Sequence, residues 1–233
     1  VSGTRGVHLH RRSGQRVGAL ATRTDQVLAM TPGYAWLRLC AGLAFSSLLV
    51  TALALGGHGR LGPGLAWHAD TWTQTPWTGW TASLVHLSWL HLGANLLGLG
   101  AIAVLGYAVK AGGFAVAALL LAWPLSNLGL VLWPNVSTCA GLSGLLHAAT
   151  AILWSFVAIN LKTTAGNRFL AWMLFGGVAL KLMLEQPWAI PVVFDPNFGF
   201  EVIQASHWLG TLVGATCGSA LALANLLDQR RGG

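Results

Sequence analysis

Apolar residues in this chain are gathered into six long runs separated by short polar segments. In order, the runs cover roughly positions 34–55, 83–109, 113–133, 142–161, 169–184 and 202–227. The hydrocarbon core of a bilayer is about 30 Å thick and takes about 20 helical residues to cross. The pattern predicts six transmembrane helices, because a continuous apolar run can satisfy all of its backbone polar groups within one helix.

The composition fits the same class of protein. Hydrophobic residues make up 55% of the chain and charged residues only 8%, whereas soluble domains carry about 25% charged residues. We therefore expect an all-α membrane domain over residues 30–229, followed by a short basic tail at 230–233. Residues 1–29 are basic and lack an apolar core, so we expect a disordered extension there, with Met30 as an alternative start of translation.

The basic residues indicate which helix ends face the cytoplasm, because lysine and arginine remain preferentially on that side. Eleven of the thirteen lie before or at the start of the first run, in the second and fourth connections, or after the last run. We expect both termini to be cytoplasmic. The net charge of +7 then reflects orientation and attraction to anionic membrane lipids, and it requires no nucleic acid partner.

Two reactive side chains lie in the outer halves of different helices. Polar side chains are costly inside a membrane, so each one is treated as functional by default. Ser143 lies between Gly141 and Gly144, whose small size would let a substrate carbonyl approach the backbone N–H groups at the helix start. With His207 near the outer start of the sixth run, the pattern predicts a serine nucleophile and a histidine base.

Further polar residues occupy the second apolar run. His91 and Asn95 are four residues apart, which puts them on one face of a helix, and two donors aimed at one point suit an oxyanion hole. An interhelical hydrogen bond is the alternative for both. His86 is expected to point partly round this helix and to hydrogen-bond the outer loop.

The sixth run carries a stripe of small residues after its histidine. Gly210 and Gly214 permit close helix packing, which would bring His207 within reach of Ser143. No acidic residue lies within one turn of His207 along its own helix. We therefore expect a Ser–His dyad in which packing, a role suited to His147, holds the imidazole in the right tautomer.

Together these residues resemble the rhomboid intramembrane serine proteases in order, spacing and side of the membrane. The matching set is His86, His91 and Asn95 in the second helix, Gly141-x-Ser143-Gly144 opening the fourth, and His207-x-x-Gly210-x-x-x-Gly214 in the sixth. The resemblance covers residues 34–227 and implies a six-helix rhomboid-like bundle. It also implies that Ser143 is the nucleophile and His207 the general base, with His91, Asn95 and the Ser143 backbone N–H stabilising the oxyanion.

A narrower likeness is to rhombosortase, the bacterial branch that processes proteins with a C-terminal Gly-Gly sorting tail. It rests on Val85-His86-Leu87-Ser88-Trp89, on the run Gly-Leu-Ser-Gly-Leu-Leu-His ending at His147, and on Lys181-x-x-x-Glu185-Gln186. By this likeness, His147 replaces a tyrosine that stacks on the catalytic histidine of many rhomboids. The likeness implies a protein of the bacterial inner membrane. The implied substrates are membrane-anchored proteins with a C-terminal transmembrane segment, cut near the periplasmic face.

Two smaller features leave alternatives open. Lys181 and Glu185 are four residues apart and can pair on one face of the fifth helix, where the pair either locks the helix or selects substrate. Cys139 is either an inert buried thiol or the site of a mixed disulfide with a partner protein. The histidines of the second helix lack the Glu and the spacing of a zinc-binding helix, so we expect no metal and no other cofactor.

Other classes of function compete with a sorting protease. A general rhomboid protease would use the same residues on other transmembrane substrates. A non-catalytic rhomboid-like protein that binds membrane clients is expected to lack the serine or the histidine. A solute transporter is expected to show an internal repeat or broken helices at the midplane, and the sequence shows no convincing repeat.

Overall fold

The computed structural model describes residues 33–56, 61–159 and 164–231, which belong to one compact unit. The predicted extension 1–29, Arg60, Lys162 and the last two residues of the predicted tail lie outside the described residues. The described chain is mainly helical, and its strands are short: β1 (Trp67–His68), β2 (Thr138–Cys139), β3 (Val192–Asp195) and β4 (Phe200–Ile203).

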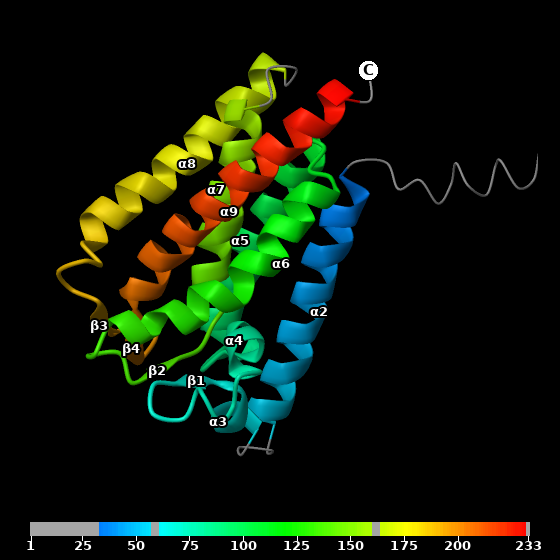
Figure 1. The fold of residues 1–233 in the computed structure, drawn as a ribbon. Helices are drawn as coiled ribbons and strands as arrows, with labels where there is room; N and C mark the ends of the chain where they lie inside the picture. The colour runs from blue at the N-terminus through cyan, green and yellow to red at the C-terminus, as the bar shows by residue number, and fades with distance from the viewer. Residues whose placement is uncertain (1–32, 57–60, 160–163, 232–233) are drawn as a thin grey trace, which may run out of the picture. The chain divides into compact units, whose positions relative to one another are not determined.

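Five helices in the described part of the chain are long and apolar enough to cross a membrane (Figure 1). They are α2 (Tyr34–Leu55), α5 (Trp89–Ala108), α6 (Gly113–Leu128) with its 3-10 continuation η2 (Gly129–Leu132), α8 (Ala165–Glu185) and α9 (Gln204–Arg231). The expectation of a helical, multi-pass membrane protein is confirmed at this level. The two-residue and four-residue strands were not predicted, because segments so short carry no recognisable alternation.

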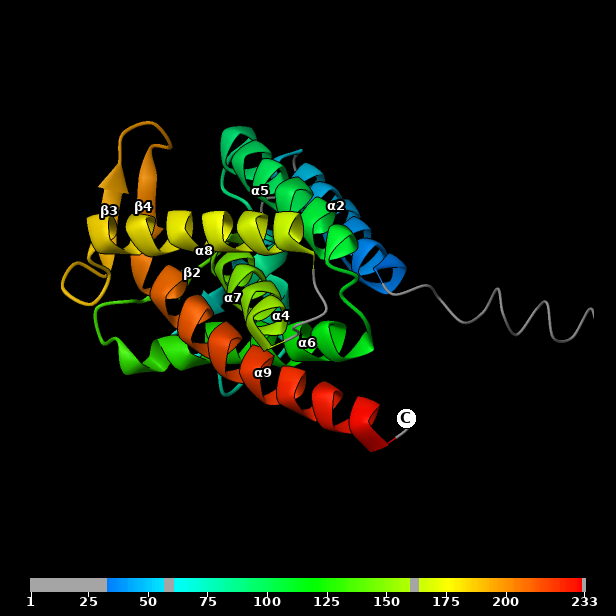
Figure 2. The same ribbon diagram turned by 90° about the horizontal axis from the view of Figure 1, so that it is seen from above.

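The remaining predicted helix, α7 (Ser143–Ile159), is shorter than the others. Its 17 residues span about 25 Å at 1.5 Å per residue. It packs against α5, α6, α8 and α9, and Figure 2 shows α8 crossing over it. Because eleven of its residues are buried, α7 is surrounded by other helices along most of its length.

The second helix begins later than predicted. The predicted start near position 83 falls in the 3-10 turn η1 (Ala82–Leu84), which follows α4 (Thr78–Thr81), and α5 starts only at Trp89. Ser88 fixes this start, because its Oγ accepts the backbone N–H of His91 at 3.1 Å, as N-cap residues do. The prediction that His86 lies on the helix is therefore wrong, and this residue lies in the connection before it.

The bounds of the last two helices also differ from the prediction. α8 begins at Ala165 and not near 169, because the Thr164 side chain caps it by accepting the N–H of Asn167 at 3.3 Å. The polar first turn carries no hydropathy signal, although it is helical. α9 begins at Gln204 and not near 202, because the two preceding residues pair with β3.

The short elements gather at the end of the bundle opposite the C-terminus (Figure 1). β1 pairs antiparallel with β2, which joins the loop after α3 (Leu61–Leu65) to the segment before α7. β3 and β4 pair antiparallel as a hairpin between α8 and α9. These connections hold the loops around Ser143, the first residue of α7.

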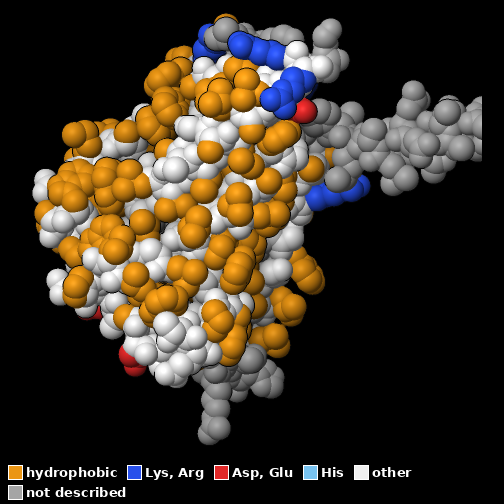
Figure 3. Space-filling model, in the orientation of Figure 1, with side chains coloured by type: hydrophobic (Ala, Val, Ile, Leu, Met, Phe, Trp, Pro, Cys, Tyr) orange, Lys and Arg blue, Asp and Glu red, His pale blue; other side chains and the backbone are white. Residues whose placement is uncertain are grey.

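Charged side chains divide between the two ends of the bundle. In Figure 3, lysine and arginine gather near the end that carries the C-terminus, acidic side chains appear mostly toward the opposite end, and the face between them is largely hydrophobic. The described basic residues near helix ends on the first side are Arg38, Lys110, Arg168, Arg230 and Arg231. The loops of the other end carry Asp70, Asp195 and Glu201.

Candidate active site

Ser143 and His207 meet where α7 and α9 begin. Nε2 of His207 is 3.0 Å from Oγ of Ser143, a distance at which an imidazole can take a hydroxyl proton. The two residues are 64 positions apart in the chain, and His207 is buried. The structure therefore brings together the two residues that the sequence marked as nucleophile and base.

Glycines on both helices make this approach possible. A Cβ added at Gly210 would overlap the carbonyl oxygen of Gly144, and one added at Gly214 would lie 2.5 Å from Cα of Ala148. No side chain larger than hydrogen fits at these positions unless the helices move apart. The predicted small-residue stripe thus faces α7 and sets the distance between His207 and the serine.

A carboxylate faces the other nitrogen of the His207 ring. Oε2 of Glu185, the last residue of α8, lies 2.8 Å from Nδ1 of His207. Oε1 of the same carboxylate pairs with the Lys181 ammonium, and Nζ of Lys181 is 3.2 Å from Nδ1 of His207. The expectation that His207 lacks an acidic neighbour is wrong, because it considered only acids on the same helix and this one comes from α8.

His147 lies against one face of the His207 imidazole. Its ring is stacked on that of His207, with centroids 4.4 Å apart and an interplanar angle of 13°. Nδ1 of His147 is 2.7 Å from the carbonyl oxygen of Ser143, which can only accept, so Nδ1 donates. The expected packing of His147 against the imidazole is therefore present, and its part in selecting the tautomer stays a prediction.

His91 and Asn95 lie on the face of α5 that meets the loop before Ser143. A Cβ added at Gly141 would be 2.7 Å from Cε1 of His91 and 3.8 Å from Nδ2 of Asn95. Gly141 has φ +116°, a conformation that favours glycine, and its N–H donates to the carbonyl of Ala82 at 2.9 Å. The loop therefore turns tightly against α5 just before the serine.

These two side chains present polar atoms without partners. Nδ1 of His91 and Nδ2 of Asn95 are buried and have no hydrogen-bond partner among the described residues. Such atoms are uncommon in folded proteins and call for a reason. The alternative of an interhelical hydrogen bond is not found for either atom in the described chain. Both residues line the cavity that contains Ser143, where an oxyanion would need donors.

His86 packs against His91 and is held by hydrogen bonds of its own. Its Nδ1 is 3.3 Å from Oγ1 of Thr51 and 3.2 Å from the carbonyl oxygen of Leu84, in agreement with the expected bond to the outer loop. Its ring packs edge-on against His91 with centroids 4.9 Å apart. Burial lowers the pKa of His86 to about 4, against the opposing effect of the Leu84 carbonyl, so this side chain is neutral at pH 7.

A cavity of about 380 Å³ connects these groups. Residues from six elements and the β3–β4 turn line it: His91, Asn95, Ser143, His147, Lys181, Glu185, Val193, Asp195, Phe198, Val202 and His207. The β3–β4 hairpin forms one wall, where the rings of Phe198 and Phe200 have centroids 5.8 Å and 5.1 Å from that of His91. The hairpin therefore covers this side of the cavity.

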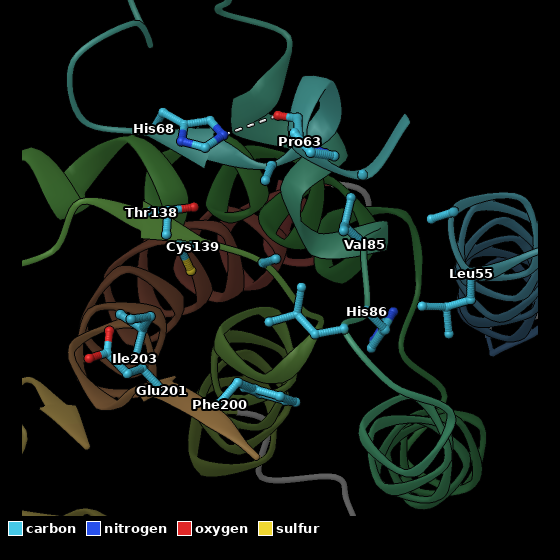
Figure 4. Close-up of a pocket in the computed structure, with 15 residues that line it drawn as sticks. Leu55, Pro63, His68, Val85, His86, Thr138, Cys139, Phe200, Glu201 and Ile203 are labelled. Carbon is cyan, nitrogen blue, oxygen red and sulfur yellow. Dashed lines mark hydrogen bonds between the residues drawn. The ribbon is translucent and has the colours of Figure 1, made fainter. Parts of the chain in front are cut away.

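A second cavity, of about 440 Å³, lies beside the strand that leads to Ser143 (Figure 4). Thr138 and Cys139 of β2 line it together with mainly apolar residues. Burial raises the pKa of the Cys139 thiol to about 12, against a hydrogen bond with Ser206 that acts the other way. The protonated, buried thiol fits the inert alternative better than a disulfide with a partner.

No group of three or more His, Cys, Asp or Glu side chains in the described residues is arranged to hold a metal ion.

No protein-family model matches this sequence, and no curated protein matches it. We therefore infer the function from the geometry of the site.

Proposed function

We propose that this protein is an intramembrane serine endopeptidase. The observation that carries the proposal is the 3.0 Å separation of Ser143 Oγ and His207 Nε2 at one end of an apolar helix bundle. His91 and Asn95 line the same cavity, and each has a buried polar atom with no hydrogen-bond partner among the described residues. A hydroxyl, a base and unused donors around one cavity are the parts that acyl transfer requires.

The reaction follows from these parts. Ser143 Oγ attacks the carbonyl of the scissile peptide bond while His207 Nε2 takes the hydroxyl proton. Asn95, His91 and the Ser143 backbone N–H, which has no helical partner at the start of α7, donate to the oxyanion. His207 then gives its proton to the leaving amine, and water that has lost a proton to His207 releases the acyl group from the serine.

Substrate must reach the serine as an extended segment, because a helix keeps its carbonyls within its own hydrogen bonds. The edge of β2 that is not paired with β1 has no strand partner in the described part of the chain, and β2 ends just before the loop that leads to Ser143. An added strand would find backbone groups along that edge. The apolar cavity beside β2 would then receive its side chains.

We assign the substrate class from the resemblance to rhombosortase. The substrates are single-spanning proteins whose C-terminal anchor begins at a Gly-Gly pair, cut near the periplasmic face of a bacterial inner membrane. The separation of basic and acidic ends supports this orientation, because the positive end would stay in the cytoplasm and Ser143 lies toward the other end. The proposed bundle crosses the membrane six times, with α7 as the short central helix and both termini in the cytoplasm.

The test is cleavage of a reporter in membranes. The reporter carries a periplasmic domain, a Gly-Gly pair, an apolar helix and a basic tail. We expect the wild type to release the domain, and Ser143→Ala and His207→Ala to release none. Ser155→Ala is the matched control, because Ser155 lies on the same helix but outside the lining of this cavity. Its hydroxyl donates to the carbonyl of Ala151 and accepts from the Ser219 hydroxyl at 3.3 Å.

The outcomes separate protease activity from sorting specificity. Release that persists in Ser143→Ala and His207→Ala would assign the cleavage to another protease and contradict the proposal. Release from anchors that lack the Gly-Gly pair, with the same dependence on Ser143, would keep the protease and favour the general rhomboid alternative. No release from any anchor by a well-folded wild type would favour a non-catalytic membrane protein.

A further inference from the structure

The His207 ring is held from both of its nitrogens, and this determines which of them can act as a base. A neutral imidazole has one N–H and one lone pair. If Nδ1 carries the hydrogen and donates to Oε2 of Glu185 at 2.8 Å, then Nε2 presents its lone pair to Ser143 Oγ at 3.0 Å. The carboxylate therefore selects the tautomer that can take the serine proton.

The Glu185 carboxylate is fixed in orientation. Oε1 pairs with the Lys181 ammonium one turn earlier on α8, so Oε2 is the oxygen left for His207. The Gln204 amide, oriented by its two acceptors, donates to the backbone carbonyl of Glu185 at 2.8 Å and to that of Ile190 at 2.9 Å. These contacts tie the end of α8 to the start of α9, three residues before the histidine.

Because Lys181 is close to His207, the Glu185 carboxylate is needed to keep the imidazole in the active tautomer. Its ammonium has only hydrogens to donate, and Nζ is already 3.2 Å from Nδ1 of His207. Without the carboxylate, Lys181 would donate to Nδ1, and the ring hydrogen would move to Nε2. In that tautomer Nε2 cannot accept the Ser143 proton. Loss of Glu185 would therefore let Lys181 hold His207 in a form that cannot act as the base.

We infer that Glu185 is the orienting acid of a Ser143–His207–Glu185 triad, with Lys181 holding its carboxylate in place; this inference rests on the proposed function. Glu185 is a positioning residue, because it acts through His207 and does not touch the substrate. The nucleophile and the base lie on helices that glycines pack closely together, whereas the acid comes from α8, of which only Ala171 and Leu182 are buried. The triad is complete only while the outer end of α8 stays against α9.

The first measurement is the rate at which a fluorophosphonate probe labels Ser143 in the purified full chain. This probe reacts with an activated serine and requires no knowledge of the natural substrate. We expect Glu185→Gln to lower the labelling rate by about 10²- to 10⁴-fold, the range in which removal of a triad acid acts. Glu185→Asp keeps a carboxylate and should give an intermediate rate. Asp228→Asn, the same chemical change near the end of α9, should label like the wild type.

A double variant tests the part assigned to Lys181. Lys181→Met/Glu185→Gln removes both the carboxylate and the competing donor, and it leaves no unpaired charge that could prevent folding. We expect it to label faster than Glu185→Gln alone. A rate for the double variant equal to that of the wild type, or a rate below that of Glu185→Gln, would overturn the inference.

The second measurement reads the tautomer itself. Protein labelled with ¹⁵N-histidine gives separate signals for Nδ1 and Nε2, and His207→Ala identifies the signals of His207 by their loss. We expect Nδ1–H in the wild type and Nε2–H in Glu185→Gln. A slower Glu185→Gln with an unchanged tautomer would mean that the residue only supports the fold, and it would overturn the inference.

These outcomes keep the two proposals apart. A wild type that the probe does not label, or labels equally in Ser143→Ala, would contradict the proposed protease. Labelling that requires Ser143 but proceeds at the same rate in Glu185→Gln would leave the protease intact and overturn only the role of Glu185.

Discussion

Helices α7 and α8 pack against each other in one bundle, yet they are built in opposite ways. Eleven of the seventeen residues of α7 are buried, whereas α8 buries two of twenty-one. A Cβ added at Gly214 of α9 would collide with α7, but one added at Gly176 or Gly177 of α8 would meet nothing within 4 Å. The proposed nucleophile and base thus lie on a tightly fitted pair of helices, and the acid lies on a loosely covered one.

A few specific contacts, and not extensive burial, hold α8 to the rest of the bundle. Trp154 of α7 stacks on Phe175 of α8 with ring centroids 4.4 Å apart. Asn167 donates to the carbonyl of Ala108 at 2.8 Å, near the start of α8, and Glu185 meets His207 at its end. The proposed reaction is therefore divided between neighbouring helices that pack differently. The tightly fitted pair, α7 and α9, sets the distance between Ser143 and His207, whereas α8 contributes through contacts that single substitutions can remove.

The largest effect is expected where a side chain is forced between the fitted helices. Gly214→Val would drive α7 and α9 apart, because the added atoms collide with the backbone of Ala148. We expect the cleavage of the reporter to fall below detection and the protein to lose about 2–4 kcal/mol of stability. Thermal unfolding in detergent micelles and the reporter assay measure the two effects.

Gly176→Val on α8 is the matched control for this change. The same substitution meets open space there, so we expect near-normal cleavage and a stability change within about 0.5 kcal/mol. Equal damage at the two positions would show that the two helices are not fitted differently, and it would remove the basis of the comparison.

A smaller effect is expected from the donors that face the cavity from α5. Asn95→Ala removes a proposed oxyanion donor and no hydrogen bond of the resting protein, because Nδ2 of Asn95 has no partner among the described residues. We expect kcat for the reporter to fall by about 10²- to 10³-fold, as for loss of one oxyanion donor, with the unfolding temperature unchanged. Leu97→Ala, at an exposed position of the same helix, should change neither.

For Asn95, a combined loss of stability and activity would argue against the donor role. It would mean that the amide supports the packing of α5, as the interhelical alternative proposed. Full activity in a folded Asn95→Ala variant would remove this residue from the reaction altogether.

The smallest effect is expected on the pH dependence of stability, through His86 in the connection before α5. The pKa of His86 is about 4 in the folded protein and 6.5 when it is unfolded. The unfolded chain therefore binds more protons as the pH falls, and stability that is present above pH 6.5 is lost between pH 6.5 and pH 4. Between pH 7.5 and pH 5.5 this one group should cost about 1.4 kcal/mol.

The variant His86→Asn isolates this contribution. It cannot titrate, so its stability should fall less than that of the wild type over the same pH range. Unfolding by denaturant in micelles at the two pH values measures the difference. Equal losses in the two proteins would show that His86 is not buried in a neutral form.

The sequence was sufficient for features that depend on local spacing. Five long apolar helices followed from hydropathy alone, and the meeting of His207 with Ser143 followed from glycines whose spacing indicates close helix packing. Helix starts were less accurate, because Ser88 and Thr164 act through single hydrogen bonds in polar segments. Hydropathy carries no signal for such caps.

The sequence singled out Glu185 as a candidate residue but did not indicate that it contacts His207. Lys181 and Glu185 were expected to pair by their spacing, and they do. That the free oxygen of Glu185 reaches His207 depends on how α8 crosses α9, which no periodicity within either helix encodes. One signal was available: an ionisable pair near the outer end of a membrane helix, in a region that already held a serine and several histidines.

Ser143 and His207 are proposed as the nucleophile and base of a membrane protease. Cleavage can be measured in liposomes that contain only the purified protein and the Gly-Gly reporter. In this setting no other protease can act. We expect a cut at the anchor by the wild type and none by Ser143→Ala. A cut of equal extent by Ser143→Ala would contradict the proposed roles of the two residues, as would a folded wild type that leaves this reporter and every other membrane-anchored reporter intact.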